Sequence, residues 1–292
     1  MKRHLIIHHI TEYRYSQSVG FDRHRMMFRP RDSHTLRLLD STLTISPKPD
    51  SVRWAYDVFG NSVAHADFGN TTADVLRFES KIGVLHYEAS EPTHLLSPLA
   101  QQYPFRYSDG ELPDLLPVMA MHADAGTQRV MEWAGGVTKG KMETLELLTA
   151  LMTEIRAHVS YRRRAAMGTQ TPSETLDLQS GTCRDFAWLM IEVLRGLGFA
   201  ARFVSGYIYS PGRTSHQGGG ATHAWVQVYL PGSGWIEMDP TNGIFGNRDL
   251  IRIAVARHHQ QAKPLSGTFI GKRTSYRGIE VSVSVLDASP QS

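Results

Sequence analysis

One stretch decides how the second half of the chain is expected to fold: residues 181–187, Gly-Thr-Cys-Arg-Asp-Phe-Ala, followed by an apolar helical pattern up to residue 198. Thr182 can cap a helix, and Asp185 suits the first turn three residues later. The pattern predicts a helix that glycines 196 and 198 end. Its apolar face consists of Phe186, Met190, Val193, Leu194 and Leu197.

Cys183 lies in the first turn of this predicted helix, and it is the one cysteine of the chain. No intramolecular disulfide can form, and zinc or iron–sulfur sites built from several thiolates are excluded. The partial positive charge and unpaired N–H groups of a helix N-terminus favour a thiolate and can stabilise an oxyanion. Gly181 is expected to leave room for a substrate. Position 183 also fits the apolar face, so an inert buried cysteine stays an alternative at this point.

Two residues that can activate a thiol follow in predicted strands, His223 in residues 222–230 and Asp239 in residues 234–239. Side chains alternate between the two faces of a strand. A five-residue loop over 230–234 pairs Tyr229 with Trp235, and it makes the histidine and the aspartate diagonal neighbours on one face. A four-residue loop without a bulge would place them on opposite faces.

Each of these residues also has an ordinary structural interpretation. His223 could be a hydrogen-bonded sheet residue, and Asp239 a turn residue before Pro240. Together with Cys183 they match the nucleophile, base and orienting group of a catalytic triad, which is the interpretation we adopt.

Two tryptophans flank these residues, and Trp225 and Trp235 are expected to wall the substrate cleft, with packing as the equal alternative. The adjacent pairs His8-His9 and His258-His259 would point to opposite faces of a strand and make poor chelators. We therefore expect no metal site and no cofactor.

The motifs resemble the core of the transglutaminase-like superfamily in order, spacing and flanking aromatics. The resemblance rests on residues 181–187, 194–207, 222–226 and 234–241. Residues 9–15, 29–31 and 57–61 resemble the β-rich N-terminal region of bacterial transglutaminase-like proteins. The resemblance implies a papain-like core and a Cys-His-Asp triad, and bacterial members of the family are usually regarded as cysteine peptidases (cysteine proteases).

The rest of the chain divides into three predicted parts. Residues 1–92 contain short β-type runs separated by turn signals, which is typical of a β sandwich or open barrel. Residues 93–118 contain four prolines and are expected to be a linker. Residues 119–292 place helices before strands, so we predict a catalytic domain of the α+β class with an antiparallel sheet.

Helical patterns in that last part cover residues 119–133 and 141–159. Thr171, Pro172 and Glu174 form a capping box with proline at the first helical position, which predicts a short helix leading to the cysteine.

Composition limits the class of protein. The chain has 292 residues, 41% of them apolar and 20% charged, as in soluble globular proteins. No apolar run approaches the roughly 20 residues of a membrane span, and the apolar stretch near the start is too short for a signal peptide, so we expect a cytoplasmic protein. The net charge of +3 is weak support for nucleic-acid binding. The basic run 162–164 is interpreted as a solvated helix end.

These observations predict a cysteine-nucleophile enzyme that cleaves peptide or other amide bonds through an acyl-thioester. Water completing the cycle gives a peptidase, and an amine gives a transglutaminase. The sequence has no recognisable acidic cluster like the calcium sites of animal transglutaminases, which favours hydrolysis. The expected partner is a peptide or protein, with neither nucleic acid nor membrane. An inactive peptide-binding module is the alternative from another class, and the oligomeric state stays open.

Overall fold

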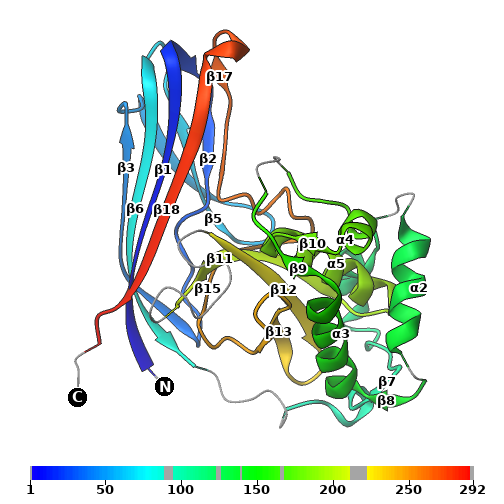
Figure 1. Ribbon diagram of the computed structural model, residues 1–292. Helices are drawn as coiled ribbons and strands as arrows, with labels where there is room; N and C mark the ends of the chain where they lie inside the picture. The colour runs from blue at the N-terminus through cyan, green and yellow to red at the C-terminus, as the bar shows by residue number, and fades with distance from the viewer. Residues whose placement is uncertain are drawn as a thin grey trace.

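The computed structural model describes residues 2–88, 95–122, 126–138, 140–164, 168–210 and 222–289. A tall β sandwich stands beside a smaller part in which helices cover one side of a twisted sheet (Figure 1). This smaller part and its sheet are called the catalytic part and the catalytic sheet, after the role predicted for them from the sequence. The described residues therefore form a β-rich α+β protein with several antiparallel sheets and α-helices α1 to α5.

The sandwich consists of two antiparallel sheets. The first has the order β17-β1-β6-β3, with β18 also pairing β1, and the second has the order β16-β2-β5-β4. Their bounds are β1 Lys2–Phe21, β2 His24–Met26, β3 Leu36–Ser46, β4 Ser51–Tyr56, β5 Ser62–Asp67, β6 Thr72–Tyr87, β16 Leu265–Ser266, β17 Phe269–Ile270 and β18 Tyr276–Asp287. In β1, Leu5, Ile7, His9 and Thr11 are buried at every second position, so one face of the strand lies in the interior.

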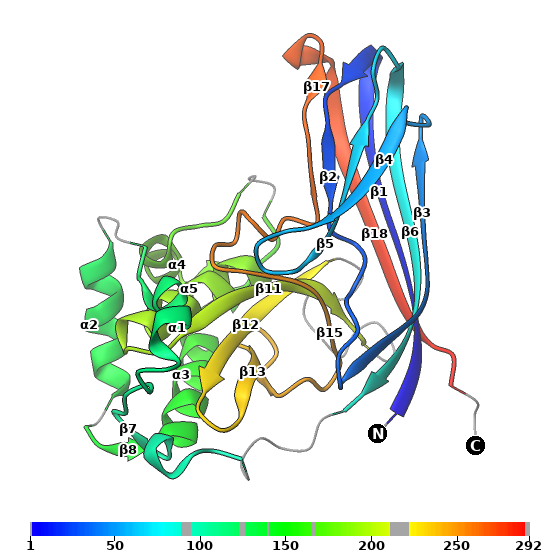
Figure 2. The ribbon, with the colours of Figure 1, turned by 180° about the vertical axis from the view of Figure 1, so that it is seen from behind.

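The C-terminal segment corrects the predicted domain boundary. The sequence predicts one catalytic domain over residues 119–292, but β18 pairs with β1 in the sandwich, from Leu5 opposite Asp287 to Tyr15 opposite Tyr276 (Figure 2). The period-2 pattern of a strand does not indicate which sheet it joins, so the sequence reveals the strand but not its partner. No described strand from residues 2–88 enters the catalytic sheet. Residues 1–92 therefore do not form the sandwich by themselves, contrary to the predicted division.

The expected linker is also more ordered than its prolines indicated. It contains a 3₁₀ turn, Pro98–Ala100, the short strand β7, Gln102–Tyr103, and most of helix α1, Leu112–Met119. Pro113 lies in the first turn of α1, where its missing N–H is no loss. Leu115 and Val118 are buried in a small apolar cluster with Ala200, so this segment packs onto the catalytic part.

The helices preceding the sheet confirm most of the sequence pattern. Their bounds are α2 Thr127–Val137, α3 Thr144–His158, α4 Pro172–Leu178 and α5 Cys183–Gly196, with short strands β8 Met142–Glu143, β9 Ser160–Tyr161 and β10 Ser180–Gly181 among them. The predicted capping box at Thr171 and Glu174 is present at the start of α4. The predicted helix 119–133 is wrong at its start, because residue 119 ends α1 and α2 begins at Thr127.

The catalytic sheet has the order β14-β13-β12-β11-β15. Its strands are β11 Ala201–Ile208, β12 His223–Leu230, β13 Gly234–Asp239, β14 Ile244–Phe245 and β15 Leu250–Ala256. Helix α5 packs on the face that carries Ala224, Val226 and Val228. Tyr229 pairs with Trp235, which confirms the predicted hairpin register. Among the described helices, none is both long and apolar enough to cross a membrane.

Candidate active site

Helix α5 begins at Cys183 because Thr182 and Asp185 form a capping box around its first turn. The Asp185 carboxylate accepts hydrogen bonds from the Thr182 backbone N–H at 2.7 Å and from the Thr182 hydroxyl at 2.8 Å. The N–H groups of Cys183 and Arg184 lie in the turn for which a helix supplies no internal acceptor. Cys183 is 7% exposed, so its thiol is reached through a narrow opening at most.

The carboxylate beneath this turn is fully buried and paired. Arg164 Nη2 lies 3.0 Å from both Asp185 oxygens, and the Gln170 backbone N–H donates at 2.7 Å. The prediction that residues 162–164 are a solvated helix end is wrong for Arg164. Its guanidinium turns inward because a buried carboxylate without a cation would be costly.

Gly181 has a packing role in place of the expected one. A Cβ at this position would lie 2.8 Å from the Asp185 Cβ and 3.1 Å from Gln170 Oε1. The space over this glycine is therefore filled by the cap of α5 and is not left for a substrate.

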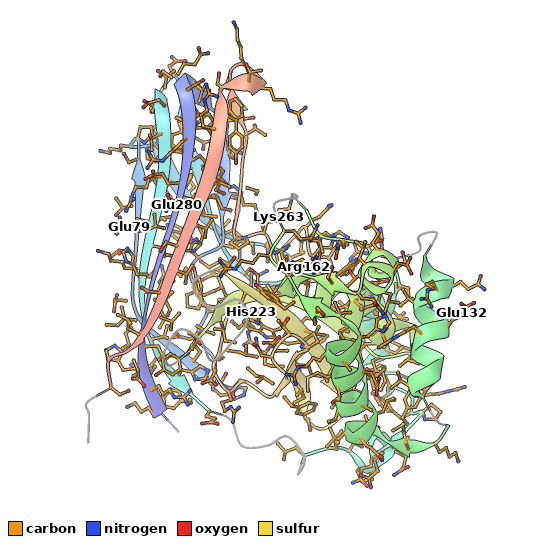
Figure 3. All side chains as sticks on the ribbon, in the orientation of Figure 1. Glu79, Glu132, Arg162, His223, Lys263 and Glu280 are labelled. Carbon is orange, nitrogen blue, oxygen red and sulfur yellow. The ribbon has the colours of Figure 1, made fainter. Side chains whose placement is uncertain are left out.

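The hairpin brings His223 and Asp239 together. His223 Nε2 lies 2.7 Å from Asp239 Oδ2, and both side chains are buried. Figure 3 shows His223 in the region of the catalytic part that faces the sandwich. Because the register places both residues on one face of the sheet, the diagonal contact expected from the sequence is formed.

The charges of the site are coupled. Burial by itself would lower the pKa of His223, but the Asp239 carboxylate and the Cys183 thiolate outweigh it and raise this pKa to about 10. Burial would raise the pKa of Asp239, and the imidazolium of His223 outweighs that effect and lowers it. Among the described residues, His223 Nδ1 has no hydrogen-bond partner. With Nε2 on Asp239, Nδ1 is the ring nitrogen left for the thiol.

Asn242 is a site residue that the sequence reasoning missed. Its Nδ2 donates to Asp239 Oδ2 at 2.8 Å and lies 3.4 Å from His223 Nε2. The Thr241 backbone N–H donates to the other Asp239 oxygen at 2.9 Å. An aspartate whose carboxylate accepts from the N–H two residues later is a turn motif, and Asp-Pro-Thr-Asn was the available signal.

Cys183, His223 and Asp239 lie within a region that matches a known protein family. Residues 131–240 match the transglutaminase-like superfamily, and residues 5–84 match the bacterial transglutaminase-like N-terminal region. The chain therefore has a transglutaminase-like core preceded by a bacterial transglutaminase-like N-terminal region.

Individual relatives differ in how much of this transglutaminase-like chain they share. An uncharacterized protein of Mycobacterium tuberculosis is 29% identical over 300 residues, covering 95% of this chain and 91% of its own. A protein-glutamine gamma-glutamyltransferase of Pseudomonas aeruginosa is 38% identical over 71 residues, 22% of this chain and 10% of its own. A crystal structure from Cytophaga hutchinsonii, described as a "Putative Cysteine Protease", has a TM-score of 0.75 at 19% identity, covering 100% of this chain and 93% of its own. That likeness supports the fold over the whole chain.

The two tryptophans of the transglutaminase-like hairpin differ in their surroundings. Trp225 is fully buried and stacks on His223 with ring centroids 5.8 Å apart, so it supports the imidazole and is not a wall of an open cleft. Its indole N–H donates to Glu237. Trp235 is partly exposed and lines a cavity of about 700 Å³ together with Tyr229 and Arg202.

The pair His258 and His259 does not lie as the sequence predicts. His258 and His259 follow β15 in a turn, and their rings lie 4.2 Å apart, so the expectation that they point to opposite faces is wrong. Burial lowers the pKa of His258 to about 4 and that of His259 to about 3. Within the described residues, no group of three or more His, Cys, Asp or Glu side chains is arranged to hold a metal ion.

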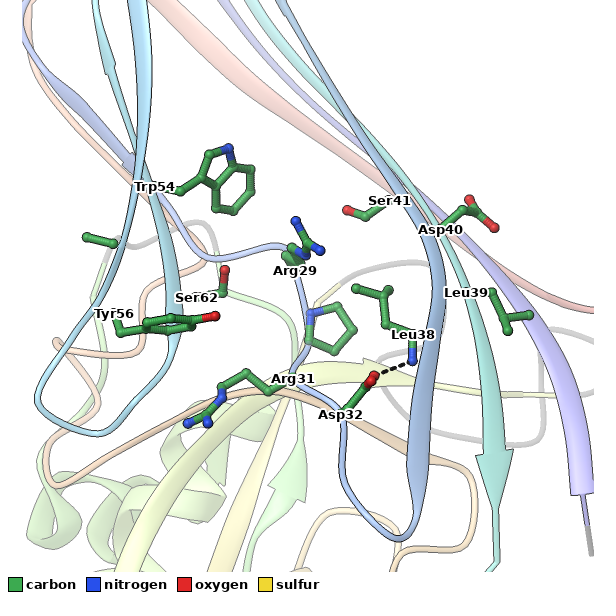
Figure 4. Close-up of a pocket in the computed structure, with 12 residues that line it drawn as sticks. Arg29, Arg31, Asp32, Leu38, Leu39, Asp40, Ser41, Trp54, Tyr56 and Ser62 are labelled. Carbon is green, nitrogen blue, oxygen red and sulfur yellow. Dashed lines mark hydrogen bonds between the residues drawn. The ribbon is translucent and has the colours of Figure 1, made fainter.

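A cavity of about 570 Å³ opens between β3 and β4 in the sandwich (Figure 4). Arg29 lies over the Trp54 ring and Arg31 over the Tyr56 ring, at 5.8 and 5.4 Å from the ring centroids. None of the residues predicted for catalysis lines it.

Proposed function

We propose that this protein is a cysteine peptidase in which Cys183, His223 and Asp239 form a catalytic triad. The observation that carries the proposal is one arrangement: a cysteine in the first turn of α5 lies close enough to His223 to help raise its pKa, and the Nε2 of His223 is bonded to a buried carboxylate at 2.7 Å. A nucleophile, a proton carrier and an orienting group in this relation suit acyl transfer from an amide.

In the first half of the cycle, the Cys183 thiolate attacks the amide carbonyl carbon and forms a C–S bond. The backbone N–H of Cys183, in the first turn of α5, is a donor for the oxyanion that develops. Because the pKa of His223 is raised, the ring begins as the imidazolium. It gives its proton to the amine as the C–N bond breaks, which leaves an acyl-thioester.

In the second half, His223 takes a proton from a water molecule whose oxygen attacks the thioester. The C–S bond breaks, the acid product leaves, and the thiolate–imidazolium pair is restored. Asp239 accepts a hydrogen bond from Nε2 throughout, which fixes the ring orientation and supports its positive charge. We also propose that the core is papain-like in joining a helix-borne cysteine to a sheet-borne histidine.

Protein-glutamine acyl transfer is the second candidate, because the matched 71-residue segment of the Pseudomonas aeruginosa protein belongs to a gamma-glutamyltransferase. Both reactions pass through the same acyl-thioester. We place hydrolysis first because water needs no second binding site, whereas transfer requires one for an amine.

Activity profiling tests the proposal. Wild type and Cys183→Ala are compared on a peptide library, with and without a primary amine, and products are identified by mass spectrometry. We expect cleaved peptides from the wild type alone. Amide products that replace the acids when amine is added would favour the transferase. Equal peptide binding by both proteins, with no product from either, would overturn the enzyme and favour a binding module.

A further inference from the structure

The catalytic sheet has a second face, opposite to α5, and this face meets the sandwich. Figure 2 shows the sheet from that side. The turn after β4 lies on it: the Asn61 side chain donates to the Val255 carbonyl at 2.7 Å and accepts from the Val255 N–H at 2.9 Å. Next to this contact is a cavity of about 260 Å³. Cys183, His223 and Asp239 are not among its lining residues.

Three arginines line this cavity, Arg31 from the sandwich and Arg202 and Arg252 from the sheet. Arg202 is stacked on Trp235, with its guanidinium 3.9 Å from the ring centroid, and its Nε donates to Gln227 at 2.7 Å. Neither partner carries a negative charge. Burial and then the charge of Arg252 lower the pKa of Arg202 to about 10, against the opposing effect of Glu237.

The carboxylates nearby are already engaged. Glu237 accepts hydrogen bonds from Trp225, from Gln227 at 2.6 Å and from Arg252 at 3.0 Å. Asp32, which also lines the cavity, accepts the Leu38 backbone N–H at 2.6 Å (Figure 4). Three guanidinium groups line the cavity together with one carboxylate, Asp32, and Glu237 pairs with Arg252 without lining the cavity. Counting both carboxylates, one positive charge has no counterpart among these five side chains.

We propose that this cavity, called here the arginine cavity, binds a small ligand through an oxyanion group, a carboxylate or a phosphate. Planar guanidinium groups match the paired oxygens of both groups and bind them with charge-assisted hydrogen bonds. Arg31 Nη1 donates to the Gly60 carbonyl at 2.8 Å, and a guanidinium has further N–H donors to offer. Because the lining arginines come from both parts of the chain, an occupant would contact the sandwich and the catalytic sheet together.

Titration calorimetry on the full chain tests this site with two probes, inorganic phosphate and succinate, at constant ionic strength. Wild type is compared with Arg31→Met and Arg202→Met. Arg53→Met is the matched control, since Arg53 is an exposed arginine of β4 that pairs with Asp67 outside the cavity. We expect one-to-one binding of at least one probe, weakened about tenfold or more by either cavity substitution and unchanged by the control.

Preference for phosphate would assign the natural ligand to phosphate compounds, and preference for succinate to carboxylates. Arg31→Met keeps the result decisive if Arg202→Met unfolds, because Arg31 is exposed and lies outside the sheet. Absence of saturable binding of both probes up to about 10 mM would overturn the proposal, as would equal weakening by Arg53→Met.

Discussion

At the scale of single residues, the geometry of Asp239 limits what it can do. One oxygen accepts from His223 and Asn242, and the other from the Thr241 backbone N–H. A carboxylate held by so many donors, and with a lowered pKa, stays ionised, and in the proposed triad it orients the ring. The cysteine, histidine and aspartate could be predicted because each lies in a recognisable local motif. Asn242 could not, since its role depends on how a turn folds back.

Replacing the orienting carboxylate by an amide should therefore reduce turnover without removing it. Asp239→Asn keeps the volume but can present a donor to Nε2 and select the wrong ring tautomer. We expect kcat to fall by up to about 10⁴-fold, as in triads where the orienting group matters most. The loss should be smaller than for Cys183→Ala, because a thiolate–imidazolium pair needs less help to form. Steady-state kinetics with circular dichroism as a folding check measures this, and wild-type kcat would refute the role.

Asn242 is predicted to act through Asp239. Asn242→Ala removes one hydrogen bond to a charged oxygen, a contribution of about 1.5–3 kcal/mol, so kcat should fall by roughly tenfold or more. As a positioning effect it should appear in kcat with little change in KM. Asn242→Ser, which can restore a shorter donor, should recover part of the loss. Equal changes in kcat for both variants, or a change in KM alone, would contradict it.

At the scale of elements, the start of α5 is stabilised by a residue that is distant in the sequence, Arg164. Local sequence predicts the cap formed by Thr182 and Asp185, since the two residues are three positions apart. It does not predict that Arg164 neutralises Asp185, because that contact joins residues 21 positions apart across a turn of the chain. The basic run therefore looked like a solvated helix end until the fold was known.

Breaking this ion pair should destabilise the helix that carries the cysteine. Arg164→Met leaves a fully buried carboxylate without its cation, for which a loss of about 3–5 kcal/mol in the free energy of unfolding is typical. Arg162→Met, at an exposed neighbouring position, is the matched control and should change little. Urea unfolding followed by fluorescence makes the comparison, and equal stabilities of the two variants would exclude a structural role for the pair.

At the scale of the whole molecule, the first and the last described strands pair with each other in one sheet. The sandwich needs β18, which pairs with β1 over eleven positions and is the last strand that the structure describes. The strands were recognisable from their alternating pattern, and the α+β class follows from helices preceding strands. Sheet membership was not recognisable, because alternation is the same in either sheet and the partners lie at opposite ends of the chain.

Removal of the C-terminal strands should therefore damage the N-terminal part. A chain ending at residue 264 lacks β16, β17 and β18, which leaves one edge of β1 unpaired and exposes apolar surface. We expect it to be aggregation-prone and to lose protection from proteases within residues 2–88. A chain ending at Asp287 is the control and should behave as the full chain does. Limited proteolysis with mass mapping decides, and an intact sandwich in the shorter chain would refute this dependence.

The central claim is that Cys183 is a nucleophile activated by His223, and the pH dependence of its alkylation tests this most directly. Because the pKa of His223 is raised to about 10, the ring is positive below that pH and favours the thiolate there. Iodoacetamide labelling of the one cysteine, followed by intact mass, should give a rate that is flat from about pH 6 to about pH 9. His223→Gln should remove the plateau, so that the rate rises with pH through the range of an ordinary thiol, about 8.5. A wild-type rate that rises in the same way as the variant's would contradict the account.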